Sequence, residues 1–160
     1  MADLITHGAA AILVKAGSGW RHVPVFVAGT LAPDVFSRVP AIITGLVHVH
    51  MVALPTKAVT MWQPLHQPVG MTLLAYLLCL FFEVSVRRAV FWNLLGGMAV
   101  HLALDLLQGH HGAGYLLAFP FSGVSFELDL VGSESTVWFS LPLALLALIV
   151  ARRRQSQAAG

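Results

Sequence analysis

The chain has 160 residues, of which 58% are hydrophobic and only 10% are charged, with a formal net charge of +2. Soluble domains carry about 25% charged residues, so this composition excludes an ordinary soluble globular protein and indicates a membrane protein. The small net charge gives no support to nucleic-acid binding. The length fits one transmembrane helical domain, assigned to residues 1–154, and residues 155–160 are expected to form a disordered tail.

Three apolar segments in the N-terminal third are predicted to form short helices. Ala2–Ala16 ends at a Gly-Ser-Gly sequence, Val23–Leu31 is followed by a proline, and Pro40–Leu54 lies between two prolines. Each is shorter than the roughly 20 residues that cross a bilayer comfortably. We therefore expect these segments to pack against other helices or to be re-entrant, rather than to span the membrane independently.

Three later segments are predicted to span the membrane: Pro68–Val86, Ala89–Gln108 and Val137–Ala151. Arg87-Arg88 forms the predicted link between the first two segments, and Arg152–Arg154 follows the third. Because Lys and Arg concentrate on the cytoplasmic side, both clusters and the C-terminus are predicted to be cytoplasmic. The sequence thus predicts an all-α, polytopic membrane bundle of about four to six helical segments.

The second predicted span contains two ionisable side chains, His101 and Asp105. An ionisable group inside an apolar segment is costly, so by default it marks a functional site. Residues four apart lie on the same face of a helix, and imidazole and carboxylate converging in this way are typical of metal ligands. The alternative is a buried His–Asp hydrogen bond that only holds two helices together.

Polar residues from several segments are predicted to lie at one membrane level. Asp105 ends the outward span, and His66 precedes the inward one. If the basic residues between the first two segments are cytoplasmic, His7 and Asp34 also lie toward the outer side. The topology therefore predicts a polar site at the outer membrane face.

The order of these motifs resembles a known family. The motifs are Thr6-His7, Leu31-Ala-Pro-Asp34, Trp62-Gln-Pro-Leu-His66, Gly97-Met-Ala-Val-His101-Leu-Ala-Leu-Asp105 and Ala118-Phe-Pro-Phe-Ser122. They resemble the predicted membrane-bound metal-dependent hydrolases, small multi-pass bacterial proteins that look like distant relatives of the all-helical, zinc-dependent phospholipases C. The resemblance covers most of residues 1–125, and the spacing within Gly97–Asp105 is its strongest match.

The resemblance implies a metal centre with these ligands: His7, Asp34, His66, His101 and Asp105. It also implies that Asp105 or Asp34 acts as general base. Imidazoles and carboxylates suit zinc, with manganese or iron as alternatives. The implied activity is hydrolysis of a phospholipid or other phosphoester at the outer face of the bilayer.

The chain departs from the family pattern at several positions. Phe36 stands where the family has a second Asp, and Met61 and Gln63 stand where its central motif has a His and an Arg. The loss of ligands favours one ion over a two-metal site. Further candidate ligands are His110 and His111, and His48 and His50 are weaker candidates.

The same departures keep a non-catalytic function open. Phe36 and Met61 favour a membrane subunit of a larger complex, in which the His/Asp cluster is a structural metal site or a hydrogen-bond network. A homo-oligomer is equally compatible with the sequence. A proton or metal-ion path is a third hypothesis, but it needs polar residues at more than one membrane depth, and the inner half offers few.

Overall fold

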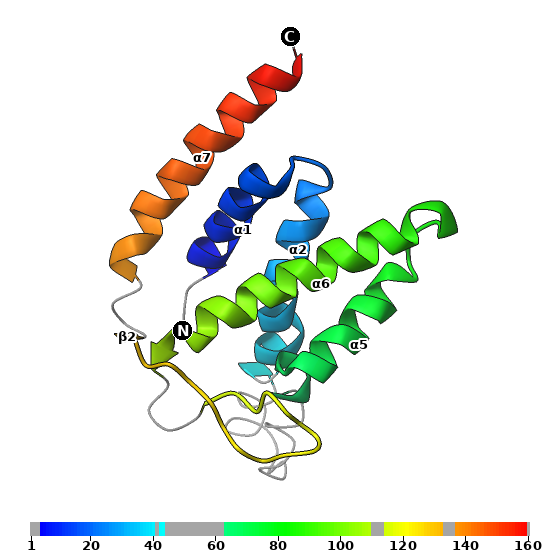
Figure 1. The fold of residues 1–160 in the computed structure, drawn as a ribbon, viewed down its shortest axis with the longest axis vertical. Coiled ribbons are helices and arrows are strands. Elements are labelled where there is room, and N and C mark those ends of the chain that lie inside the picture. Colours follow the sequence, from blue (N-terminus) through cyan, green and yellow to red (C-terminus); the bar gives the residue numbers. More distant parts are fainter. Residues whose placement is uncertain (1–3, 41, 44–62, 110–113, 133–136, 160) are drawn as a thin grey trace.

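The structure is a computed structural model that describes residues 4–40, 42–43, 63–109, 114–132 and 137–159 (Figure 1). Helices make up most of these residues, which confirms the predicted all-α class. The helical elements are α1 (Leu4–Ser18), α2 (Val23–Pro33), the π-helical turn η1 (Asp34–Arg38), the 3-10 turn η2 (Gln63–His66), α5 (Pro68–Cys79), α6 (Val84–Leu106) and α7 (Val137–Ala159). Two short strands, β1 (Gln108–Gly109) and β2 (Val131–Gly132), pair in parallel.

Helix α6 is the central element of the fold. Helix α2 crosses it, α5 folds back along it, and α1 packs against α2 and α7 (Figure 1). The backbones of α2 and α6 touch because each helix has a glycine at the crossing. A Cβ atom on Gly97 would collide with the Phe26 carbonyl oxygen, and a Cβ atom on Gly29 would collide with the Leu94 carbonyl oxygen. Any larger residue at either glycine would force the two helices apart.

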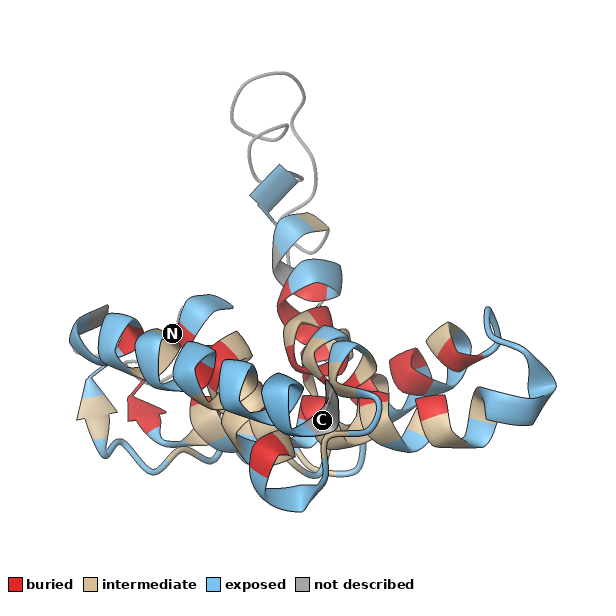
Figure 2. Cartoon of the chain, turned by 90° about the horizontal axis from the view of Figure 1, so that it is seen from above, coloured by how far each residue is buried: buried red, intermediate tan, exposed pale blue. Residues whose placement is uncertain are grey.

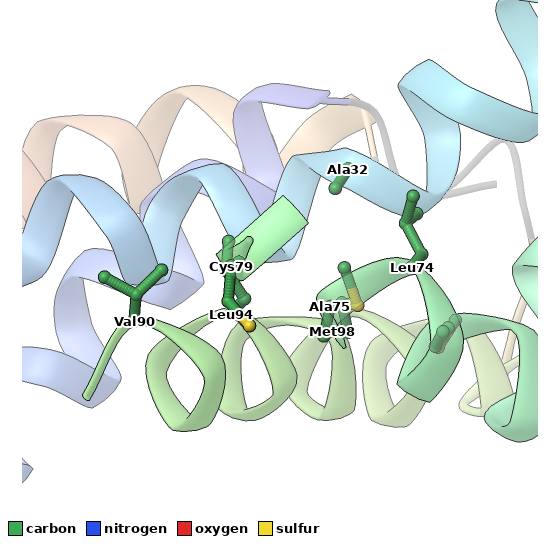
Figure 3. Packing of buried hydrophobic residues seen from close by; sticks show 8 residues of the cluster. Ala32, Leu74, Ala75, Cys79, Val90, Leu94 and Met98 are labelled. Atoms are coloured by element: carbon green, nitrogen blue, oxygen red, sulfur yellow. The ribbon is translucent and has the colours of Figure 1, made fainter. Parts of the chain in front are cut away.

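An apolar cluster joins α2, α5 and α6 (Figure 3). Its buried members are Ala32, Met71, Leu74, Ala75, Cys79, Val90, Leu94 and Met98. The three from α6 recur every fourth residue, which puts them on one face of that helix. Burial is confined largely to such inward faces, and the outer faces of the helices are exposed (Figure 2).

The boundary between α5 and α6 differs from the predicted one. Helix α5 ends at Cys79 instead of Val86, and α6 begins at Val84 instead of Ala89. Arg87 therefore lies inside α6, where its Nη2 donates to the carbonyl oxygens of Leu80 (3.3 Å) and Phe82 (3.1 Å). These bonds satisfy two backbone acceptors in the turn between α5 and α6 and tie the turn to the first part of α6.

Helix α2 also differs from its prediction. The chain stays helical through Pro33, which was expected to stop it, and continues into the π-helical turn η1. Within this turn Val39 N–H donates to the Asp34 carbonyl oxygen, five residues back. Proline has no N–H to donate, and the wider π-helical turn accommodates its position in the helix.

The expected disordered tail is helical. Helix α7 continues past Arg154 to Ala159, because Arg, Gln and Ala all favour helix. Arg154 Nη2 donates to the carbonyl oxygen of Ala16 at 2.7 Å, so this helix is tied to the C-terminal end of α1. The bond satisfies one of the carbonyls that a helix leaves open at its end.

Among the described residues, one helix is long and apolar enough to cross a membrane, namely α6. Helices α1 and α5, and α2 together with most of η1, are apolar but shorter. The apolar part of α7 ends at the arginines that begin with Arg152. Three spans are predicted from the sequence, and one helix is both long and apolar enough to cross a membrane, so the polytopic arrangement is not supported.

Candidate metal centre

Five side chains singled out in the sequence lie together at one end of the fold. They come from α1, η1, η2 and α6, and all are buried: His7, Asp34, His66, His101 and Asp105. His7, His101 and Asp105 have 0% exposure, and Asp34 and His66 have 6% each. Segments almost a hundred residues apart in the sequence therefore converge on one polar cluster inside an otherwise apolar molecule.

Helix α6 supplies the centre of the cluster. His101 and Asp105 lie on one face, as their spacing predicts, and His101 Nε2 is 3.3 Å from Asp105 Oδ2. This face continues the apolar one that packs on α2 and α5, so the packing of α6 also orients its polar residues. Downstream, Leu128 N–H donates to the Leu106 carbonyl oxygen at 2.8 Å and closes the end of the helix.

Helix α1 contributes His7. Its imidazole stacks on that of His101, with ring centroids 4.1 Å apart and an interplanar angle of 28°. His7 Nε2 lies 3.3 Å from Asp105 Oδ1, the carboxylate oxygen that His101 does not approach. The two oxygens of Asp105 thus face different histidines.

The turn η2 contributes His66, which lies between two other elements that carry cluster residues, η1 and α6. Its Nε2 lies 3.0 Å from both Asp105 Oδ2 and His101 Nε2. Its Nδ1 lies 3.0 Å from the Oγ of Ser37. The turn can fold tightly onto α5 because Gly70 has no Cβ atom, which would collide with the Pro64 carbonyl oxygen.

The π-helical turn η1 contributes Asp34 at the edge of the cluster. Asp34 Oδ1 lies 3.9 Å from His101 Nε2 and 4.0 Å from His66 Nδ1. These separations exceed a hydrogen-bond distance, and they leave Asp34 farther from the other donor atoms than Asp105 is. The two carboxylates therefore occupy different positions relative to the histidines.

The donor atoms fit a divalent metal ion. His66 Nε2, His101 Nε2 and Asp105 Oδ2 are mutually 3.0, 3.0 and 3.3 Å apart. Zinc lies about 2.0–2.2 Å from nitrogen and oxygen ligands, so two ligands of a tetrahedral ion are roughly 3.4 Å apart. In two overlapping groups all donor atoms lie within 4.8 Å of one another: His7/His101/Asp105 and Asp34/His66/His101. Because both groups contain a buried carboxyl, a divalent cation would give each a partner of opposite charge.

Of the positions that depart from the family pattern, only some lie among the described residues. The side chain of Phe36 is 40% exposed, whereas Asp34, two residues earlier, is buried in the cluster. Phe36 therefore lies outside the cluster. Gln63 begins η2. The other positions lie outside the described residues: Met61, His48, His50, His110 and His111.

Two residues at the site were missed from the sequence, Ser37 and Tyr115. Tyr115 Oη donates to Asp105 Oδ2 at 2.6 Å, and its ring lies against His66 with centroids 5.5 Å apart. Backbone pairing with Phe126 holds this tyrosine in place. No motif spacing in the sequence points to Tyr115, because the contact forms only when the segment after α6 packs against the cluster. Ser37 is marked only by its spacing of three residues from Asp34.

Comparisons of the chain with protein-family models, with curated proteins and with solved structures find no match. Its function therefore has to be inferred from the chemistry of the buried cluster.

Proposed function

We propose that the chain is a metal-dependent hydrolase of the membrane-bound family that its motifs resemble. One observation carries this proposal. The five residues that match the family's ligand positions, from His7 to Asp105, converge in a single buried cluster with ligand-like separations. Residues that matched the family motifs only by chance would be expected to scatter over the fold and to include exposed positions.

The cluster divides naturally into ligands and a base. His66, His101 and Asp105 are the proposed first ligands, because their donor atoms are 3.0–3.3 Å apart. His7 contacts the other oxygen of Asp105. Asp34 lies farther from the other donor atoms and is the better of the two candidate general bases. Unlike Asp105, it can accept a proton from water without the loss of a bond to the metal.

Zinc is the ion that this donor set suits best, with manganese or iron as alternatives. When bound, the ion supplies positive charge that activates water and stabilises the negative charge that develops on a phosphoester. Asp34 and His66 are slightly exposed, while the other three residues are completely buried. Among the described cluster residues, the substrate is therefore proposed to approach from the side of Asp34 and His66.

A location in the bacterial inner membrane, with several helices in the bilayer, is part of the proposal. Large apolar side chains are exposed on the helices and in the turn between α5 and α6, among them Phe81 of the turn at 86%, Trp138 at 83% and Leu141 at 70%. Such surfaces in a soluble monomer would be liable to aggregate. The bilayer is the proposed environment for them, and α6 is the candidate span.

The charge distribution supports a site at the outer face. Arg88 and Asp105 lie at opposite ends of α6, roughly 25 Å apart at 1.5 Å per residue. Lys15 likewise lies at the opposite end of α1 from His7. With the basic ends and the C-terminus cytoplasmic, the cluster faces outward at the depth of lipid headgroups. A phospholipid or another phosphoester is the proposed substrate.

The proposal is tested by metal content. Detergent-purified wild-type protein is compared with the double variant His101→Ala/Asp105→Ala by elemental mass spectrometry. We expect about one zinc, manganese or iron per chain in the wild type and none in the variant. His22→Asn is the matched control, because His22 is an exposed histidine outside the cluster. A folded, metal-supplied wild type without metal would contradict the proposal.

One observation favours a second candidate, a non-catalytic subunit of a larger membrane complex. His7, His101 and Asp105 are completely buried, as ligands of a closed structural metal site are. This candidate predicts bound metal but no release of phosphate or headgroup from phospholipid vesicles of mixed composition. It also predicts that the protein leaves the membrane in mild detergent as part of a larger assembly.

A further inference from the structure

The hydroxyl of Ser37 connects the π-helical turn to the cluster. Ser37 is buried, with 4% exposure, and lies three residues after Asp34 in η1. Its Oγ is 2.5 Å from the Pro33 carbonyl oxygen and 3.0 Å from His66 Nδ1. One side chain therefore bridges a backbone carbonyl and a histidine of the site.

The single proton of this hydroxyl determines the direction of both hydrogen bonds. The Pro33 carbonyl oxygen can only accept, so Ser37 Oγ donates its proton there. Ser37 Oγ then faces His66 Nδ1 with a lone pair, and Nδ1 must carry a proton to donate to it. Asp34 Oδ1 is 4.0 Å from the same Nδ1, beyond hydrogen-bond distance. A neutral His66 is thus protonated on Nδ1, and its Nε2 carries a lone pair.

This lone pair points toward the other donor atoms of the cluster. His66 Nε2 is 3.0 Å from Asp105 Oδ2, and no proton of neutral His66 lies on that side of the ring. The neighbouring Tyr115 hydroxyl donates to the same oxygen, but it supplies nothing to Nε2. His66 Nε2 is also 3.0 Å from His101 Nε2, which donates to it only when that nitrogen carries a proton. The hydrogen bond on the far side of the imidazole thus leaves the Nε2 lone pair available to a proton of His101 or to a cation that binds these donor atoms together.

We propose that Ser37 is a positioning residue that holds His66 as its Nδ1–H tautomer and directs the Nε2 lone pair at the metal ion. The inference rests on the proposed metal centre, and it adds a hydrogen bond from outside the ligand set that orients one of the ligands. Partners of this kind fix the tautomer and orientation of metal-binding histidines. The chain supplies the partner through η1, where Ser37 and Asp34 both approach the Nδ1 side of His66.

Three variants separate this role from a general effect on folding. Ser37→Ala removes the hydroxyl, and Ser37→Thr restores it, since threonine can also bond the carbonyl four residues back. Thr30→Val is the matched control. Thr30 is a fully buried residue of α2 whose hydroxyl donates to the Phe26 carbonyl oxygen at 3.1 Å, in the same pattern as Ser37 but away from the histidines.

The first readout is zinc affinity by chelator competition, supported by the visible absorption of the cobalt-loaded protein. We expect Ser37→Ala to weaken zinc binding about 10–100-fold, the usual effect of losing an outer-shell partner. The zinc affinity of Ser37→Thr should lie within a few-fold of the wild-type value, and that of Thr30→Val should equal the wild-type value. Cobalt absorption should change in Ser37→Ala and not in Thr30→Val.

The second readout is nitrogen NMR of histidine-labelled, zinc-loaded wild-type protein, with His66 assigned by its absence in His66→Gln. A protonated Nδ1 and a metal-bound Nε2 are expected. An unprotonated Nδ1, or a ring protonated on both nitrogens, would overturn the inference even if Ser37→Ala fails to fold. Wild-type zinc affinity in Ser37→Ala would overturn it while leaving the metal centre intact. Absence of metal from the folded, metal-supplied wild type would overturn both the proposed metal centre and this inference.

Discussion

The two halves of helix α6 bury the same face by different means. Toward its N-terminus, Val90 and Leu94 pack into the apolar cluster with α2 and α5. Toward its C-terminus, His101 and Asp105 occupy the same face and contact polar side chains from α1, from η2 and from the segment after α6. One half is stabilised by removal of apolar surface from water, and the other depends on specific polar partners.

The difference predicts different tolerance to substitution. Apolar packing responds mainly to volume, so the N-terminal half should accept replacements that conserve it. A buried polar group that loses its partner costs free energy without any change of volume. The N-terminal half is therefore expected to be sensitive to changes of side-chain volume, and the C-terminal half to the loss of a polar partner.

The largest expected effect is loss of the bound metal when the carboxylate of Asp105 is neutralised. Asp105→Asn removes the charge that His66, His101 and Tyr115 approach, so bound metal should fall from about one ion per chain to none. Glu83→Gln is the matched control, because Glu83 is exposed just before the opposite end of α6. Elemental mass spectrometry measures both. Metal retained by Asp105→Asn would mean that this carboxylate is not a required ligand.

The second prediction concerns the apolar half. Leu94 is 4% exposed, so Leu94→Ala should lower the free energy of unfolding in detergent by about 2–5 kcal/mol. The folded fraction should retain its metal. Leu77→Ala is the control, since Leu77 is 47% exposed and should change stability by about 0.5 kcal/mol or less. Loss of metal from folded Leu94→Ala would show that the two halves are not independent.

A smaller effect is expected from the tyrosine that contacts the polar half. Tyr115→Phe removes the hydrogen bond to Asp105 Oδ2 and should weaken metal binding about 10-fold. Chelator competition measures the change. Tyr76→Phe serves as control, because Tyr76 is 52% exposed on α5. Equal affinities in the two variants would assign Tyr115 a packing role only.

The smallest effect tests a departure from the family pattern. Phe36→Asp introduces the residue that the resembling family carries, but the side chain at position 36 is 40% exposed, unlike the buried residues of the cluster. The metal content per chain should therefore stay as in the wild type. A second ion bound by Phe36→Asp, measured by the same mass spectrometry, would show that this position can reach the site.

The candidate site was predictable where local spacing decides it. His101 and Asp105 share a helix face because four residues make about one turn, and this follows from the sequence alone. The resemblance and the expected topology brought in His7, Asp34 and His66. Ser37 and Tyr115 were not predictable, since one depends on a π-helical turn and the other on backbone pairing with Phe126.

The helical class was predictable from composition, and the helix ends were not. Hydropathy continues through Phe81 and Phe82, so it does not reveal that α5 stops at Cys79. The turn depends on hydrogen bonds from Arg87, which hydropathy counts only as a charge. In α7 the polar composition after Arg154 suggested disorder, but helix propensity and the contact with Ala16 extend the helix.

The glycine crossing of α2 and α6 has a mechanical consequence for the cluster. Gly97 is one turn before His101, and Gly29 is five residues before Asp34, so both site residues lie within roughly 6–8 Å of the pivot. With lever arms this short, a change of about 10° in the crossing angle displaces them by only about 1 Å. The N-terminal end of α6, about 20 Å from the pivot, would move about three times as far as His101. This end of the bundle can thus shift while the spacing of the cluster stays nearly constant.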